Sequence, residues 1–169
     1  PWVANMWQGI YVSVNAANNI IGRVPEMLPG TISTEKSAQF IGEAKFVRAL
    51  NYLFLVRAFG KIPLKLSYTT EDEDVAIPQA TVEETYTQII KDLTEAAAAL
   101  PEDYAGDIAA TKGRATKYAA LGLLAKAYLY QATLTKDYSK AAATAAQVIA
   151  SNKFQLVTDF RSIWQTENT

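Results

Sequence analysis

Residues 123–150, LLAKAYLYQATLTKDYSKAAATAAQVIA, are the stretch that best predicts how this chain folds. Apolar residues recur there at spacings of three and four, which is the spacing along one face of an α-helix. A polar turn at Asp137 separates two such runs, so the stretch predicts two helices joined by a short connection. Small residues at Ala141 and Ala145 allow the helices to approach closely, and an aromatic ring such as Tyr128 fills the groove of a neighbouring pair.

These features match part of the tetratricopeptide pattern, in which helical hairpins stack side by side. The matching residues are Leu124, Ala125 and Tyr128 in the first helix and Ala141, Ala145 and Val148 in the second. A few extra residues at 133–136 lengthen the link between the two helices. Segments 34–59 and 82–100 form a second possible pair, which is less regular because a long excursion separates them.

Helical periodicity extends through most of the remaining chain. It predicts helices over residues 2–21, 34–59, 82–100, 116–131 and 138–150. Gly22 is expected to end the first helix, and Asn152 the last. Thr81 and Glu84 have the spacing of a capping box at a helix start. The pattern predicts an all-α fold, because it contains no convincing sheet.

Two segments fall outside this helical pattern. Residues 61–80 are expected to form a long excursion, with a short extended piece near 62–64. The apolar segment at 154–164 follows the last helix, and its periodicity does not decide its conformation.

The helix near 116–131 is apolar almost all round, so we expect it to be the most buried one.

Composition excludes several functions. The chain has 16 Lys and Arg against 17 Asp and Glu, so it has no basic surface for nucleic acid. It contains no Cys and no His, which excludes disulfides, common zinc sites, cysteine nucleophiles and histidine-based triads. No nucleophile–base pair, metal-ligand set or phosphate loop can be assembled, so we expect neither an enzyme nor a cofactor.

The two ends of the sequence suggest an excised part of a longer protein. The chain opens inside an amphipathic pattern, without the basic region and cleavage site of a secretion signal. It stops just after an apolar segment. The apolar runs within it are far shorter than the roughly 20 residues of a membrane-spanning helix.

Motifs along nearly the whole chain resemble one family, the SusD/RagB outer-membrane lipoproteins of glycan uptake systems. The motifs are, in chain order, Trp7-x-x-x-Tyr11, Ala17-Asn18-x-Ile20-Ile21, Gly42-Glu43-Ala44-Lys45-Phe46-Val47-Arg48-Ala49-x-x-Tyr52, Phe59-Gly60-x-Ile62-Pro63-Leu64, Tyr86-x-x-Ile89-Ile90-x-Asp92-Leu93, Leu100-Pro101, Arg114-x-Thr116-Lys117-x-Ala119-Ala120, Leu124-Ala125-x-x-Tyr128-Leu129-Tyr130, Asp137-Tyr138-x-x-Ala141 and Val148-Ile149-x-Ser151-Asn152-x-Phe154-x-Leu156. No single motif is diagnostic, and the resemblance depends on their order and spacing.

The resemblance implies that residues 1–169 are the tetratricopeptide-containing N-terminal region of a cell-surface protein. This region is expected to fold as an α–α superhelix. Such proteins are tethered to the outer membrane by a lipid-modified Cys, and they sit over a TonB-dependent transporter resembling SusC. They bind oligosaccharides or polysaccharides and pass them inward without catalysis. The chain departs from the family in lacking the lipidated Cys and the C-terminal half, which usually supplies much of the ligand site. Asn152 stands where the family more often has Gly.

Aromatic residues provide the candidates for sugar contact. Tyr68 and Tyr104 lie on loops between helices, and we expect them to be the best exposed aromatics, although weak candidates. Trp7 lies on an amphipathic stripe, so core packing is the favoured interpretation. Trp164 is expected to pack against residues beyond the chain, and the role of Trp2 stays open.

Charged and polar residues mostly favour structural interpretations. The acidic run at 71–74 could attract Ca²⁺, yet four adjacent residues cannot all turn inward, so we interpret it as a solvated loop and expect no metal site. Glu43, Arg48 and Asp92 are expected to link different helices. Asn18 lies on an apolar stripe, and a buried amide must be hydrogen-bonded, so we expect it to hold a neighbouring loop.

Residues 114–117 could bind an anion at a helix start, although capping by Thr116 is the favoured interpretation.

A second hypothesis for the whole chain is an intracellular tetratricopeptide adaptor that binds a partner peptide. It depends on the Leu124–Val148 pair alone, whereas about three repeats are usual for a stable array.

Overall fold

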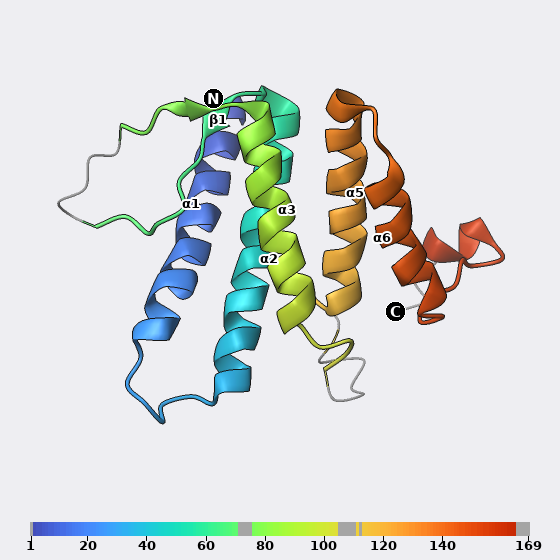
Figure 1. The fold of residues 1–169 in the computed structure, drawn as a ribbon, viewed down its shortest axis with the longest axis horizontal. Helices are drawn as coiled ribbons and strands as arrows, with labels where there is room; N and C mark the ends of the chain where they lie inside the picture. Colours follow the sequence, from blue (N-terminus) through green and yellow to red (C-terminus); the bar gives the residue numbers. More distant parts are fainter. Residues whose placement is uncertain (1, 71–75, 105–110, 112, 165–169) are drawn as a thin grey trace.

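The computed structural model describes residues 2–70, 76–104, 111 and 113–164. The elements are the helices α1 (Trp2–Arg23), α2 (Thr34–Phe59), α3 (Val82–Ala99), α5 (Lys117–Thr135) and α6 (Ser139–Ala150), the 3₁₀ turns η1 (Val24–Glu26) and η2 (Phe160–Trp164), and the strands β1 (Ile62–Pro63) and β2 (Gln79–Ala80). The helices stand side by side and alternate in direction, each packing on the next in chain order (Figure 1). The all-α, hairpin-array prediction is therefore confirmed.

Side chains cap the helix starts, as predicted for Thr81 and Thr116. The Ser33 hydroxyl accepts the Lys36 amide at the start of α2 (3.2 Å), and the Thr116 hydroxyl accepts the Ala119 amide at the start of α5 (3.2 Å). At α3 the capping box forms in full: the hydroxyl of the N-cap threonine accepts an amide, and the N3 carboxylate accepts in return. Each cap satisfies an amide that the helix itself leaves unpaired.

The predicted ends of two helices are wrong. Gly22 does not end α1, because the helix continues through it to Arg23. This glycine instead makes room for a packed ring, since a Cβ there would lie 2.6 Å from Cε1 of Tyr68. Helix α5 runs to Thr135, beyond the predicted end near residue 131, and Lys136 follows it in the left-handed conformation (φ 62°). Asn152 also has a positive φ (55°), as expected after a helix.

The core lies between the helices, and α2 contributes most to it. Tyr52 and Leu55 of α2 and Ile89 and Leu93 of α3 are completely or almost completely buried. Helix α2 packs between α1 and α3 and buries more residues than α5 does, so the expectation that α5 is the most buried helix is wrong. Apolar character all round α5 does not bury it on every side, since Leu129 and Leu134 are exposed.

Two short strands close the excursion between α2 and α3. β1 pairs antiparallel with β2, with Ile62 opposite Ala80 and Pro63 opposite Gln79. The extended piece near 62–64 is therefore confirmed, whereas β2 was not predicted. The acidic run at 71–74 lies outside the described residues.

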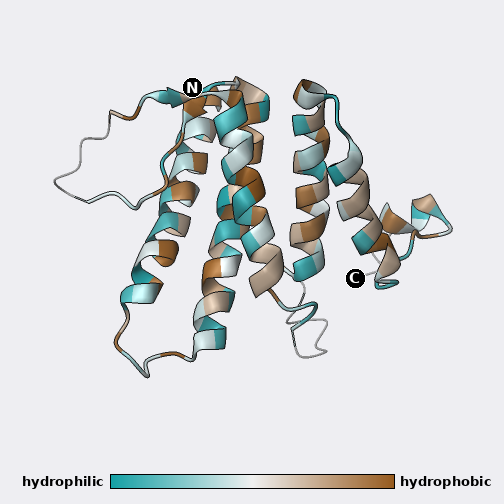
Figure 2. Cartoon of the chain, in the orientation of Figure 1, coloured by the Kyte–Doolittle hydropathy of each residue, from teal (hydrophilic) through white to brown (hydrophobic). Residues whose placement is uncertain are grey.

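The C-terminal end of the array carries exposed apolar side chains. Hydrophobic residues continue onto the outer side of the helices and into the segment after α6 (Figure 2). Exposed ones there include Ile149, Phe154, Leu156, Phe160 and Trp164. Leu156 is 98% exposed, so this segment adds little to the core.

Candidate functional site

A buried ion pair lies at the centre of the three N-terminal helices. Arg48 of α2 donates to Asp92 of α3 through two bonds, from Nε to Oδ2 (2.8 Å) and from Nη2 to Oδ1 (2.7 Å). Its Nη1 also donates to Oδ1 of Asn18 on α1 (2.8 Å). The predicted links between helices are thus confirmed for this pair. Two parallel bonds fix the guanidinium, which in turn holds α1, α2 and α3 at one point.

The same network holds the backbone of the excursion where it leaves α2. Four side chains donate to carbonyl groups within residues 63–67 of this segment. The bonds run from the Tyr11 hydroxyl to Pro63 O (2.7 Å), the Tyr52 hydroxyl to Lys65 O (2.5 Å), the Asn18 amide to Lys65 O (3.0 Å) and Ser67 O (2.9 Å), and Arg48 Nη1 to Leu66 O (3.2 Å). The prediction that Asn18 holds a neighbouring loop is confirmed.

Burial of these donors affects their acidity. It raises the pKa of the Tyr11 hydroxyl to about 12, and it raises the pKa of Tyr52 further. The two phenols therefore stay protonated, and keep donating to the excursion, at alkaline pH where an ordinary tyrosine with a pKa of about 10 ionises. Residues 63–67 form a fixed wall beside α1.

A second polar cluster joins α2 to the start of α5. The Tyr104 hydroxyl lies 2.9 Å from Glu43 Oε1 and 2.6 Å from the carbonyl oxygen of Ala115. Arg114 donates to the same Glu43 oxygen (2.5 Å), and its guanidinium carbon lies 3.9 Å from the centre of the Tyr104 ring. Burial, and then the Glu43 carboxylate, raise the pKa of Tyr104 to about 12. The predicted interhelical role of Glu43 is confirmed.

The two tyrosine candidates differ in what surrounds them. The expected exposure of Tyr104 is wrong, because the residue is only 8% exposed and its hydroxyl contacts Glu43 of α2 and the Ala115 carbonyl just before α5. Tyr68 is half-buried: its ring packs against Gly22, and the Arg23 guanidinium lies 4.6 Å from the ring centre. The two rings have different partners: Tyr68 packs against the end of α1, whereas Tyr104 is held between α2 and the start of α5.

The tryptophans also separate into two kinds. Trp7 packs against the core, with its ring edge-to-face on Phe59 (4.9 Å between centroids) and tilted against Tyr11 (5.0 Å), which confirms the core-packing interpretation. Trp2 and Trp164 are each 76% exposed. The Trp164 ring lies edge-to-face to that of Phe160, with 6.2 Å between the centroids.

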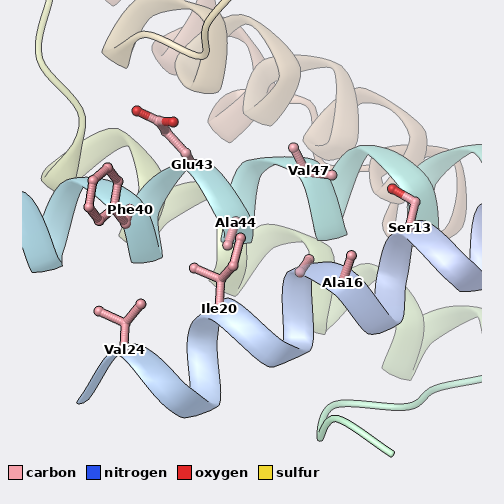
Figure 3. A pocket seen from close by; sticks show the side chains of 9 residues that line it. Ser13, Ala16, Ile20, Val24, Phe40, Glu43, Ala44 and Val47 are labelled. Atoms are coloured by element: carbon pink, nitrogen blue, oxygen red, sulfur yellow. The ribbon is translucent and has the colours of Figure 1, made fainter. Parts of the chain in front are cut away.

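A groove with a volume of about 440 Å³ runs between α1 and α2. Its lining residues are Ser13, Ala16, Ala17, Ile20, Val24, Phe40, Glu43, Ala44 and Val47. Figure 3 shows Ile20 of α1 directed toward Ala44 of α2, whereas the Glu43 carboxylate points away from α1. A hydroxyl-rich ligand would find almost no hydrogen-bonding partner in such an apolar groove.

The described residues contain no group of three acidic side chains placed to hold a metal ion. Arg114 is engaged by Glu43, and Thr116 caps α5, as the capping interpretation predicted. None of the described helices combines the length and the apolar character needed to cross a membrane.

Comparison with known protein families gives a match over most of the chain. A family model described as starch-binding and associating with the outer membrane matches residues 2–129. A SusD-like protein from Bacteroides ovatus is 28% identical over 173 aligned residues, covering 98% of this chain and 31% of that protein.

Solved structures of similar fold give the same result. A crystal structure of a SusD-like protein from Bacteroides fragilis superimposes with a TM-score of 0.84 at 30% identity, covering 98% of this chain and 31% of that one. A structure named as a laminarin-binding SusD-like protein has a TM-score of 0.82 at 29% identity, covering 97% of this chain and 35% of that one. The chain thus spans about a third of the length of these relatives.

Proposed function

Because this chain belongs to the SusD-like family of starch-binding proteins that associate with the outer membrane, we propose that it is a glycan-binding part of a nutrient-uptake system. The family match over residues 2–129 is the single observation that carries this proposal. In this role the chain binds an oligosaccharide or polysaccharide and does no chemistry on it.

The site geometry supports a binding role. Four buried or half-buried side chains fix the backbone of residues 63–67 through hydrogen bonds, so this segment is ordered before any ligand arrives. A wall that is already ordered loses little conformational entropy on binding. The helical array below it supplies the rigid support on which such a surface depends.

A role in nutrient uptake requires a transporter as partner and a position at the outer membrane. We propose that the protein delivers its ligand to a SusC-like TonB-dependent transporter. It is displayed at the cell surface and held to the outer membrane by a lipid anchor outside this chain. Residues 1–169 then act as the N-terminal helical region of the protein. Family membership favours this reading over an intracellular adaptor, which depends on the α5–α6 pair alone.

Tyr68 remains the aromatic candidate for sugar contact in the loops. Tyr68 is half-buried, and its ring packs against Gly22 and the Arg23 guanidinium, so only part of the ring is open to a ligand. Tyr104 is better explained as a structural residue, because Glu43, Ala115 and Arg114 engage both its hydroxyl and its ring.

Native affinity electrophoresis tests glycan binding directly. The 169-residue chain is run through gels that contain soluble starch, laminarin or other polysaccharides, beside a gel without glycan. We expect at least one glycan to slow the chain relative to a non-binding marker protein. Equal mobility in every gel would contradict glycan binding by these residues. A pull-down from outer-membrane extract, with a TonB-dependent transporter as the expected partner, tests the delivery role separately.

A further inference from the structure

A small pocket opens where the first turns of α1 meet the base of the excursion. It has a volume of about 200 Å³ and is lined by Trp7, Tyr11, Pro63, Lys65 and Ile77. The pocket therefore lies between a helix that carries two aromatic rings and the segment that the polar network holds in place.

The aromatic side of this pocket is fixed by the core. Phe59 contacts the Trp7 ring edge-to-face and Tyr11 contacts it at a tilt of 46°, so the indole has little freedom to turn. Trp7 is only half-buried, and its remaining surface lines the pocket. The flat face of an aromatic ring attracts the slightly positive C–H groups of a sugar ring.

The opposite side of the pocket is fixed by hydrogen bonds. Tyr11 donates to the carbonyl of Pro63 (2.7 Å), and Tyr52 and Asn18 both donate to the carbonyl of Lys65 (2.5 and 3.0 Å). The Tyr11 oxygen, having donated its proton, still has lone pairs that accept a hydrogen bond from a ligand hydroxyl. The pocket thus combines apolar faces with a polar atom at a defined position, as ligand pockets generally do.

We propose that this pocket binds a single sugar ring of the glycan, stacked on Trp7 and hydrogen-bonded at Tyr11. The inference rests on the proposed glycan-binding function and places a contact site for it within these residues. The larger groove between α1 and α2 does not fit the same ligand, because its lining is almost entirely aliphatic apart from Phe40, Ser13 and Glu43.

A substitution that fills the pocket tests the proposal. Ile77 lies on the excursion and is half-buried, so Ile77→Trp adds bulk to the pocket without removing a core residue. Ile149→Trp is the matched control, because Ile149 is 77% exposed on α6. Circular dichroism checks that both variants keep the wild-type helix content. Calorimetric titration with the glycan that slows the wild-type chain most in gels then gives the affinities.

We expect Ile77→Trp to weaken binding by about tenfold or more and Ile149→Trp to leave the affinity within about twofold. Unchanged binding by a folded Ile77→Trp chain would overturn the sugar pocket, while glycan binding itself would stand. No binding by the wild-type chain to any glycan would overturn both the pocket and the proposed function.

Tryptophan fluorescence gives a second measurement that does not depend on the filled pocket. The chain has three tryptophans, and Trp2 and Trp164 are both highly exposed, so replacing both with Phe leaves Trp7 as the only tryptophan, which is excited selectively over the tyrosines. Stacking of a sugar on the indole should change the Trp7 emission as the glycan saturates the chain. Calorimetric binding with an unchanged Trp7 spectrum would overturn the proposal.

Discussion

Replacing Arg48 with Met removes the cation at the centre of the N-terminal helices. The side chain of Arg48 is 5% exposed and that of Asp92 is 1% exposed, so both charges lie away from water. The substitution keeps a long apolar stem but leaves the Asp92 carboxylate buried, with the Gln88 amide (3.0 Å) still donating to it. The bonds from Arg48 to Asn18 and to the Leu66 carbonyl are lost as well.

The cost of this substitution follows from the unpaired charge. Removing one partner of a buried ion pair destabilises a protein by about 3 to 5 kcal/mol, mainly because the remaining charge is poorly solvated. With a urea m-value of about 2 kcal/mol/M, the unfolding midpoint falls by about 1.5 to 2.5 M. This is a large fraction of the stability of a typical domain.

Urea unfolding followed by far-ultraviolet circular dichroism measures the effect. Arg57→Met is the matched control, because Arg57 lies on the same helix but is exposed and contacts the Tyr130 ring. We expect this control to cost less than about 1 kcal/mol. A double variant, Arg48→Met with Asp92→Leu, should recover more than half of the loss, since it removes the buried charge. If Arg48→Met unfolds at the same urea concentration as Arg57→Met, the account of the ion pair is refuted.

Three further outcomes test other parts of the structure. Gly42→Val should destabilise the chain by about 1 to 3 kcal/mol in urea unfolding, because even a Cβ at Gly42 would lie 3.0 Å from the Ala99 Cβ of α3; an unchanged midpoint would argue against this close approach. Thr116→Ala should cost about 1 kcal/mol, since α5 loses its cap, while Thr116→Ser should retain most of it in the same assay. Burial and Glu43 raise the pKa of Tyr104 to about 12, so its contribution to stability is present below the ordinary tyrosine pKa of about 10 and is lost as the pH rises from there toward 12. Tyr104→Phe should make unfolding less sensitive to pH in that range, and a variant with the wild-type pH dependence would contradict this reasoning.

Features with local causes could be predicted from the sequence. Thr81 and Glu84 are three residues apart, and Ser33 and Thr116 stand immediately before apolar periodic segments, so the helix starts are determined by neighbours in the chain. Asn18 was predicted to hold a loop for a similarly general reason, because an amide on an apolar stripe must find a partner wherever it is.

Features that depend on distant partners could not be predicted in the same way. Arg48 and Asp92 are 44 residues apart, and only the packing of α2 on α3 brings them together. Tyr104 was expected to be exposed because it lies on a loop, yet its partner Glu43 is 61 residues away on α2. Gly22 was interpreted as a helix stop, whereas its role is to accommodate Tyr68 from the excursion. A two-residue strand such as β2 carries too little periodicity to be detected.

The candidate site shows the same division. Trp7 was correctly assigned to the core from its place on the α1 stripe, but the pocket beside it contains residues of the excursion. Ile77 and Lys65 reach that pocket only because β1 and β2 pair and the polar network holds residues 63–67 against α1. Periodicity cannot show such a juxtaposition, because neither segment is regular.

Saturation-transfer NMR on the wild-type 169-residue chain tests the central claim most directly. The protein resonances are irradiated in the presence of soluble starch fragments, laminarin fragments or other oligosaccharides, and the ligand protons are observed. We expect saturation to be transferred to at least one oligosaccharide. Its saturation-transfer signal should fall when the polysaccharide of the same kind is added as a competitor. No transfer to any oligosaccharide at millimolar concentration would contradict the claim that these residues bind glycan.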